Sequence, residues 1–287
     1  MEGFLIYRKE DAARNSHYIT MYEEKGKKMG VRVLLRYFEH FSFGAKKGRS
    51  TLFYQGEPIE QKPDFLIVRA DVPLFSKRLE SLGFLVFNNA YLSQIANDKE
   101  KTLCLAKAHN IPVPETCFAT KKTAIELARK LSFPLVIKPL DGHGGADVFM
   151  LQNEAELAAL IPGYEHARFL LQRPVSELGK DLRVYVVGNR IIAGMLRSRA
   201  DDFRSNYCLG GTASRYDFSA EELALVNRAI SLFDVDYAGF DFMFDQGQMV
   251  LNEIEDVVGA RMLYHETDID IVALYLEHIM NKVQNTH

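Results

Sequence analysis

The chain has 287 residues, 47% of them hydrophobic, so it can bury a sizeable core and is long enough for two or three subdomains. Its 35 basic and 38 acidic residues leave a formal net charge of -3, which gives no electrostatic footprint for nucleic acid or for an anionic membrane surface. No apolar run approaches the roughly 20 residues that span a bilayer, the first residues lack the pattern of a secretory signal, and the 3 cysteines have no metal-ligand spacing, so we expect a cytoplasmic protein that binds neither membrane nor nucleic acid.

Short apolar runs alternate with helical patterns over residues 1–95. Strands are expected at residues 4–7, 31–35, 51–54, 57–59, 65–68 and 84–87, and helices at residues 19–29 and 74–82. Gln55-Gly56 is expected to form a hairpin turn between the strands at 51–54 and 57–59. The run at 65–68 is apolar at every position, as in a parallel strand that is buried on both faces. This alternation predicts a small parallel α/β domain.

The rest of the chain divides into two parts. Residues 96–176 are expected to hold a helix that Asn97-Asp98 caps and that ends near residue 109, an extended linker at 111–114, helices at 123–131 and 154–160, and strands at 134–139 and 169–172. Residues 177–287 are richer in strands, expected at 182–187, 191–196, 240–244 and 249–254, with helices at 220–233 and 269–283. The sequence therefore predicts a mixed α/β and α+β protein of three parts.

A glycine-rich loop follows the strand that ends at Lys138. The glycines are Gly142, Gly144 and Gly145. A lysine at a strand end can reach a phosphate, and a loop without side chains lets backbone N–H groups approach phosphate oxygens. No Gly-Lys-Ser/Thr follows, so this is not a P-loop. The alternative is a turn that only connects two elements.

Three carboxylates gather on the last two predicted strands: Asp241, Glu253 and Glu255. A three-residue hairpin loop at 245–247 would place Glu253 diagonally across from Asp241 on one face of the ladder, with Glu255 following. Hard oxygen ligands of this kind suit Mg²⁺. The alternative is a solvated strand face neutralised by an arginine such as Arg261.

Four arginines form a basic set between these two motifs: Arg183, Arg197, Arg199 and Arg204, with Asn206 close to the last. Asp181 and Arg183 flank one residue, so in a strand they share a face. Guanidinium groups grip phosphate and carboxylate oxygens bidentately. The alternative is a charged surface ribbon.

Arg69 directly follows the apolar strand at 65–68. Ligands of open α/β sheets collect at the carboxyl ends of strands, so we expect Arg69 to contact a substrate carboxylate. Arg14 and Asn15, which follow the first strand, are weaker candidates of the same kind. The alternative is a helix-capping or surface arginine.

These pieces, in this order, resemble the ATP-grasp superfamily and, within it, the RimK-type amino-acid ligases. The matching segments are Asp98-Lys99, Ile111-Pro112-Val113-Pro114, Val136-Ile137-Lys138, Gln172-Arg173-Pro174-Val175, Gly179-Lys180-Asp181-Leu182-Arg183, Asp202 to Asn206 with Gly210-Gly211, Gly239-Phe240-Asp241 and Asn252-Glu253-Ile254-Glu255. The order of the set makes a chance match improbable.

The resemblance implies a role for each matched residue. Lys99, Lys138 and the loop with Gly142, Gly144 and Gly145 would contact nucleotide phosphates, while Gln172 and the backbone of Arg173, Pro174 and Val175 would hold adenine. Asp181 would approach the ribose or the basic groups of the site. Arg183, Arg197 and Arg204 would neutralise the transferred phosphoryl group, with Asn206 beside the phosphates. Asp241, Glu253 and Glu255 would hold Mg²⁺, with Mn²⁺ as an alternative ion.

Three residues depart from the family pattern. Glu255 stands where an asparagine is usual, Arg173 where a glutamate is usual, and Asp147 where the last glycine of the phosphate loop is usual. The first change adds negative charge to the metal site, the second removes an acidic contact from the hinge, and the third would stiffen the loop.

The resemblance implies a ligase that converts ATP, a carboxylic acid and an amine into an amide, ADP and phosphate. Its substrates would be an amino acid or a peptide, including a protein terminus, and association into a homo-oligomer would be in keeping with free-standing ligases. The alternatives are peptide-bond synthesis of the glutathione or dipeptide type, and a nucleotide-binding protein that has lost catalysis, an idea motivated by Glu255.

Overall fold

The computed structural model describes the whole chain except residues 47, 141, 143–146, 200–201, 204–210 and 286–287. Its N-terminal part is built on a parallel sheet in the order β2-β1-β6-β7, as the alternation predicted. The strands are β1 (Glu2–Tyr7), β2 (Arg32–Tyr37), β6 (Phe65–Val68) and β7 (Val86–Phe87), and the helices around them are α1 (Lys9–Arg14), α2 (Ser16–Lys28), α3 (Pro73–Ser81) and α4 (Ala90–Ala96). We did not predict α1 or α4.

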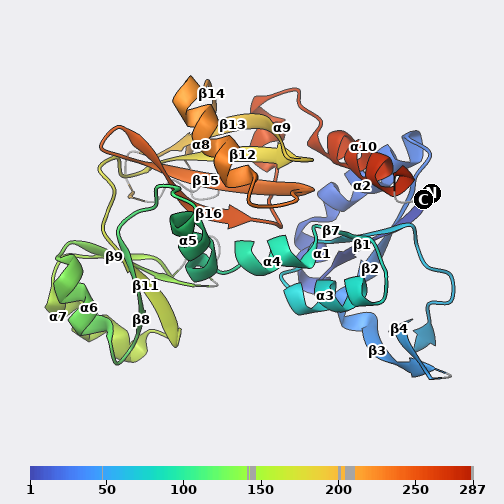
Figure 1. Cartoon of the computed structure of the whole chain (residues 1–287), viewed down its shortest axis with the longest axis horizontal. Helices are drawn as coiled ribbons and strands as arrows, with labels where there is room; N and C mark the ends of the chain where they lie inside the picture. The colour runs from blue at the N-terminus through green and yellow to red at the C-terminus, as the bar shows by residue number, and fades with distance from the viewer. Residues whose placement is uncertain (47, 141, 143–146, 200–201, 204–210, 286–287) are drawn as a thin grey trace.

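A small antiparallel sheet projects from this part, in the lower right of Figure 1. Its strands are β3 (Phe41–Lys46), β4 (Arg49–Tyr54) and β5 (Glu57–Pro58), preceded by the 3-10 turn η1 (Phe38–His40). The turn at Gln55 and Gly56 joins β4 to β5 as expected, and both residues have positive φ. Phe41 and Phe43 of β3 pack on Phe75, a long-range contact that the local pattern does not reveal.

The middle sheet is antiparallel, in the order β10-β9-β11-β8. It consists of β8 (Thr116–Thr120), β9 (Leu135–Pro139), β10 (Phe149–Leu151) and β11 (Arg168–Gln172), with α5 (Lys99–Ala108), α6 (Ala124–Leu131), α7 (Glu154–Leu160) and the 3-10 turn η2 (Ile161–Gly163) in the same part of the chain. Ala124, Ala128 and Leu131 form the buried stripe of α6, at the spacing of one helix face. The Asp98 side chain caps α5, as the sequence predicted.

The C-terminal sheet is also antiparallel, in the order β14-β13-β12-β15-β16. It contains β12 (Lys180–Val187), β13 (Arg190–Ser198), β14 (Thr212–Tyr216), β15 (Tyr237–Asp245) and β16 (Gln248–Glu255), followed or interrupted by α8 (Ala220–Ile230), α9 (Arg261–Glu266) and α10 (Ile271–Gln284). Ser219 and Glu222 form a reciprocal capping box that starts α8.

The hairpin of β15 and β16 differs from our prediction. Its loop has two residues, Gln246 and Gly247, both with positive φ, and the predicted three-residue loop is wrong. Gln246 tolerates the left-handed backbone of this turn type, so two residues suffice. A bulge between Asp241 and Phe242 then shifts the pairing by one residue. As a result Asp241 and Glu253 are directly opposite each other on the same face of the sheet, instead of diagonal.

The first and last parts of the chain share a hydrophobic core. Helix α10 lies beside α2 (Figure 1), with Tyr275 packed edge-on against Tyr22 at 6.3 Å between ring centroids. Asn88, which follows β7, is buried, and its side chain donates to the backbone oxygens of Tyr237 and Asp256. This contact fastens the end of the N-terminal sheet to the C-terminal sheet.

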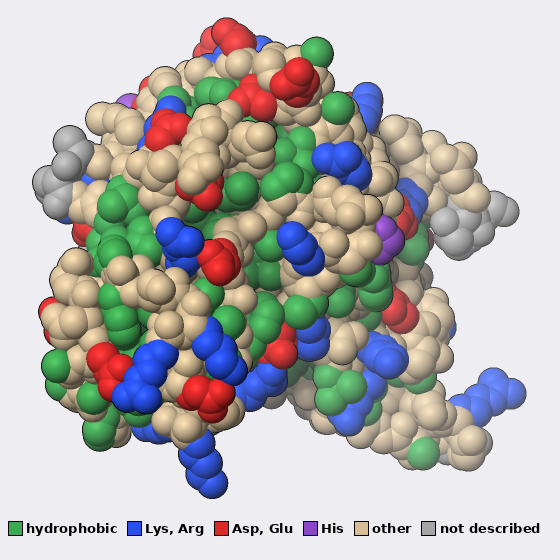
Figure 2. Space-filling view, turned by 60° about the vertical axis from the view of Figure 1, so that its left-hand side comes forward, with side chains coloured by type: hydrophobic (Ala, Val, Ile, Leu, Met, Phe, Trp, Pro, Cys, Tyr) green, Lys and Arg blue, Asp and Glu red, His purple; other side chains and the backbone are tan. Residues whose placement is uncertain are grey.

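Charge is spread over the face of the molecule that Figure 2 shows. On the face in Figure 2, basic and acidic side chains are interspersed, with no large area of a single sign. Among the described residues, no helix combines the length and the apolar character needed to cross a bilayer.

Candidate active site

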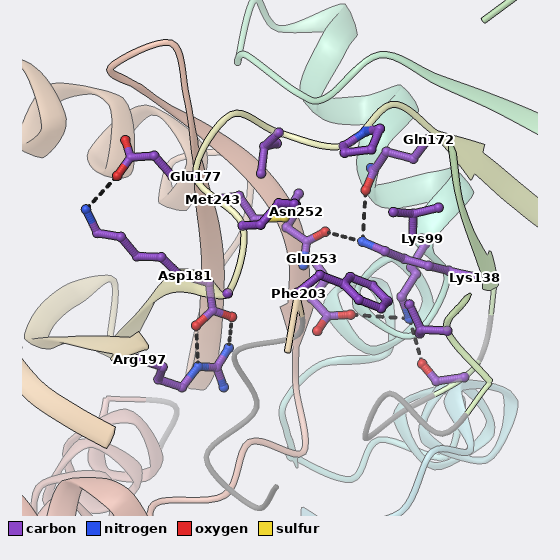
Figure 3. A pocket seen from close by; sticks show the side chains of 18 residues that line it. Lys99, Lys138, Gln172, Glu177, Asp181, Arg197, Phe203, Met243, Asn252 and Glu253 are labelled. Carbon is purple, nitrogen blue, oxygen red and sulfur yellow. Dashed lines mark hydrogen bonds and ion pairs between the residues drawn. The ribbon is translucent and has the colours of Figure 1, made fainter. Parts of the chain in front are cut away.

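A cavity lies between the middle and C-terminal sheets (Figure 3). It is lined by many of the residues expected to bind the nucleotide: Lys99, Lys138, Gly142, Gln172, Pro174, Val175 and Asp181, together with Arg197 and Glu253. These residues come from α5, β9, β11 and the loops that follow β9 and β11 on one side, and from β12, β13 and β16 on the other. Residues that are distant in sequence therefore meet in one site.

Two lysines converge in this cavity. Lys138 Nζ donates to Gln172 Oε1 at 2.9 Å and to Asn252 Oδ1 at 3.1 Å, while Lys99 Nζ donates to the Gly142 carbonyl at 2.6 Å. Burial lowers the pKa of Lys138 to about 8, and the positive charge of Lys99 acts in the same direction. A nearby anion would restore the full charge of Lys138, so this end of the cavity favours phosphate.

A buried network of charges lies behind the cavity wall. Asp241 is fully buried and accepts from Arg183 Nε at 2.8 Å, from Arg183 NH2 at 2.6 Å and from Arg197 NH2 at 2.8 Å. Arg197 also forms a two-bond fork with Asp181, and Arg183 reaches Glu255 Oε1 at 2.8 Å. The network explains why these charged side chains tolerate burial, since each has a partner of opposite sign.

The network decides between our alternatives for the arginines and the carboxylates. Arg183 and Arg197 are buried, so neither belongs to a surface ribbon, and they, rather than Arg261, neutralise Asp241. Burial alone would raise the pKa of Asp241, but the two guanidinium groups outweigh it and lower the pKa to about 2. Asp241 is thus ionised at neutral pH.

The carboxylates of Asp241, Glu253 and Glu255 could hold a metal ion together. Each offers one oxygen, and these atoms all lie within 4.8 Å of one another. Lys99 Nζ stands 3.2 Å from Glu253 Oε2, and although burial opposes it, this lysine helps to lower the pKa of Glu253. A set of hard oxygen donors matches the ligand preference of Mg²⁺.

Other residues singled out in the sequence do not contribute side chains to the described lining of the cavity. The side chain of Arg173 is exposed and pairs with Glu115 at 3.1 Å, while its chain neighbours Gln172 and Pro174 line the cavity. Asp147 contacts His166 at 3.2 Å. The remaining expected residues, Gly144, Gly145, Arg204 and Asn206, lie outside the described part of the chain.

From the sequence we assigned no role to Asn252 and did not predict most of the apolar side chains that line the cavity. Asn252 holds Lys138, and the apolar residues that line the cavity are Val136, Val148, Leu178, Phe203 and Met243. Apolar side chains that line a ligand cavity look the same in sequence as core residues. The usable signal was the position of Asn252 next to Glu253 in the matched motif.

Arg69 lines a second cavity, of about 300 Å³, together with Arg14 and Asn15. It is only 5% exposed, and its NH2 donates to the Val258 carbonyl at 2.8 Å. Its guanidinium lies over the rings of two tyrosines of the shared core, Tyr18 and Tyr237. The alternative of a surface arginine is therefore wrong.

Comparisons with known proteins agree with this geometry. Residues 96–279 match the family model of the RimK-like ATP-grasp domain. A protein of Maridesulfovibrio salexigens named probable alpha-L-glutamate ligase is 29% identical over 246 residues, covering 82% of this chain and 81% of that protein. A protein of the same name from Methanococcoides burtonii is 26% identical over 291 residues, covering 97% and 95%.

Solved structures share the fold. D-alanine–D-alanine ligase from Bacillus anthracis, complexed with ATP, superposes with a TM-score of 0.73 at 17% identity, covering 100% of this chain and 98% of that one. The ATP-grasp ligase PsnB, complexed with a minimal precursor, gives a TM-score of 0.72 at 18% identity, covering 97% and 98%. With the family model matching more than half of its length, the chain belongs to the RimK-like ATP-grasp family and is an ATP-dependent carboxylate–amine ligase.

Proposed function

We propose that this ligase activates the carboxylate of an amino acid or a peptide as an acyl phosphate, and that ATP binds in the cavity between the middle and C-terminal sheets. The observation that carries the proposal is the convergence of Lys99, Lys138 and a carboxylate cluster in that cavity. Relatives named for glutamate ligation support an amino acid as one substrate.

The cavity offers lysines for phosphates and apolar side chains for the base. Lys138 donates to the neutral amide oxygens of Gln172 and Asn252. A charged phosphate oxygen in their place would form a stronger hydrogen bond with the lysine. Pro174 and Val175 also line the cavity and offer apolar surface where the faces of adenine would fit. The fork between Asp181 and Arg197 supports a role for Asp181 in positioning Arg197 rather than in binding ribose.

The donor set fits Mg²⁺, and Mn²⁺ would suit the same oxygens. We propose that Glu253 and Glu255 hold the ion and that Asp241 contributes one oxygen while remaining paired with the arginines. A bound ion supplies charge neutralisation for the phosphate oxygens. Lys99, which now contacts Glu253, would then be available to a phosphate.

The reaction needs positioning and charge neutralisation more than covalent help. A carboxylate oxygen attacks the terminal phosphorus, the bond to ADP breaks, and an acyl phosphate forms. Arg197 lines the cavity and can act on this group directly, whereas Arg183 acts through Asp241 and Glu255. The amine then attacks the carbonyl carbon and phosphate leaves, with the amine proton passing to phosphate or solvent.

The test is ADP release with ATP and Mg²⁺ against pools of amino acids, dipeptides and small polyamines, with mass spectrometry of each active pool. We expect release that depends on one pool and a product mass equal to the two substrates minus water. Glu253→Gln should abolish it, while Glu24→Gln, on the exposed face of α2, should not. A protein that binds no ATP and releases no ADP in any pool would refute the proposal.

A further inference from the structure

The segment that joins β11 to β12 separates two cavities. On one side Val175 lines the nucleotide cavity. On the other side Ser176 lines an outer cavity of about 400 Å³, together with Asp245 and Gln246 of the hairpin formed by β15 and β16. The outer cavity leaves that side of the segment without close packing, so hydrogen bonds must fix the position of the segment there.

Ser176 and the hairpin form a reciprocal pair of hydrogen bonds, which we call the clamp. The Ser176 N–H donates to Asp245 Oδ1 at 2.9 Å, and the Gln246 N–H donates to Ser176 Oγ at 2.6 Å. Gln246 is the first residue of the two-residue turn, so its N–H lies outside the ladder of the hairpin and needs a partner elsewhere. The clamp therefore fastens the segment to the C-terminal sheet at two points.

The clamp also orients the peptide group between Val175 and Ser176. This peptide bond is trans, so its carbonyl points away from its N–H, and the N–H faces Asp245. The Val175 carbonyl therefore points away from the outer cavity and towards the nucleotide cavity. Within the described residues no donor is bonded to this carbonyl. An acceptor of this kind in the wall of a ligand cavity is available to a donor on the ligand.

We propose that Ser176 and Asp245 are positioning residues for the nucleotide, and that their clamp holds the Val175 carbonyl where it accepts a hydrogen bond from the exocyclic amino group of adenine. The inference rests on the proposed function and adds what selects the base. A purine with a carbonyl in place of that amino group would set one acceptor against another, which disfavours it. Neither Ser176 nor Asp245 touches the nucleotide in this arrangement, because both act through the backbone.

The first test is titration calorimetry of the protein in Mg²⁺ with ATP, inosine triphosphate and inorganic tripolyphosphate. Inosine triphosphate carries a carbonyl where adenine carries its amino group, and tripolyphosphate has neither base nor ribose. We expect ATP to bind at least roughly 10-fold more tightly than inosine triphosphate, because the hydrogen bond to the Val175 carbonyl is lost. Equal binding of the two nucleotides would overturn the inference.

Variants of the clamp separate positioning from a general structural role. Asp245→Ala should weaken ATP binding by about 10-fold and reduce the preference for ATP over inosine triphosphate, while tripolyphosphate binding stays within about 2-fold. Ser176→Ala removes only one of the two bonds, so we expect a loss of about 3-fold, and it serves if Asp245→Ala does not fold. Asp245→Asn keeps an acceptor oxygen and should stay within about 2-fold of wild type. Asp268→Ala, at an exposed residue that lines neither cavity, is the control and should bind all three ligands as the wild type does.

The outcomes distinguish this inference from the proposed function. An unchanged preference for ATP over inosine triphosphate in both alanine variants would overturn the inference alone, as would an equal loss for ATP and tripolyphosphate. A wild-type protein that binds neither ATP nor tripolyphosphate would refute the proposed function and the inference with it. ATP binding that depends on Asp245, without ADP release in any pool, would uphold the inference and count against the proposed substrates.

Discussion

Replacing Asp241 with Asn removes the carboxylate that both buried guanidinium groups share. Asp241 accepts three hydrogen bonds from Arg183 and Arg197 and has no exposed surface. Its pKa is lowered from 3.8 to about 2, which corresponds to about 2 kcal/mol of stability at neutral pH. Breaking a buried pair on one side costs about 3–5 kcal/mol, so we expect the melting temperature to fall by roughly 6–10 °C.

The assay is thermal unfolding in EDTA without nucleotide, so that no metal role contributes. Glu255→Gln is the matched control, because Glu255 also contacts Arg183 but its side chain is 24% exposed, and it should cost about 1 kcal/mol or less. A fall of less than about 2 °C for Asp241→Asn would refute the reasoning. If the fall is seen, lost turnover in this variant does not identify a metal ligand, and Glu253 is the residue to test.

The same carboxylate predicts a dependence on pH. Its folded pKa lies below its unfolded pKa, so its contribution is complete above about pH 4 and is lost as the pH falls towards 2. The difference in stability between wild type and Asp241→Asn should therefore shrink across this interval. A difference that stays constant from pH 5 to pH 2 would contradict the ionised pair.

Three further predictions concern the nucleotide cavity. ADP binding just above pH 8 should be accompanied by uptake of a proton, because a bound phosphate raises the lowered pKa of Lys138. Calorimetry in buffers of different ionisation heat measures this uptake, and Lys138→Met should abolish it. Glu253→Gln should reduce turnover by roughly 100-fold or more with a melting temperature within about 2 °C of wild type, and equal loss in Glu24→Gln would contradict this. Arg173→Ala should leave ATP affinity within about 2-fold, since Arg173 forms only an exposed pair with Glu115, and a larger loss in a binding titration would place its side chain in the adenine site.

Local patterns in the sequence were sufficient for most elements of the fold. The wholly apolar run at 65–68 predicted β6, and the Asp98 cap predicted the start of α5. The ordered motifs also brought Lys138, Gln172 and Glu253 into one expected site, because each residue type is suited to one part of phosphoryl transfer and their order along the chain is specific.

Tertiary structure alone decided how the charged residues are paired. A charged residue looks the same in sequence whether it is solvated or buried, so Arg183 and Arg197 could not be assigned to Asp241 before the strands were aligned. The alignment depends on a two-residue turn and a bulge, and a shift of one residue moves every side chain to the opposite face. For the same reason the sequence did not reveal that Tyr7 and Arg69 lie close together, because this depends on the long-range pairing of Ile6 in β1 with Val68 in β6.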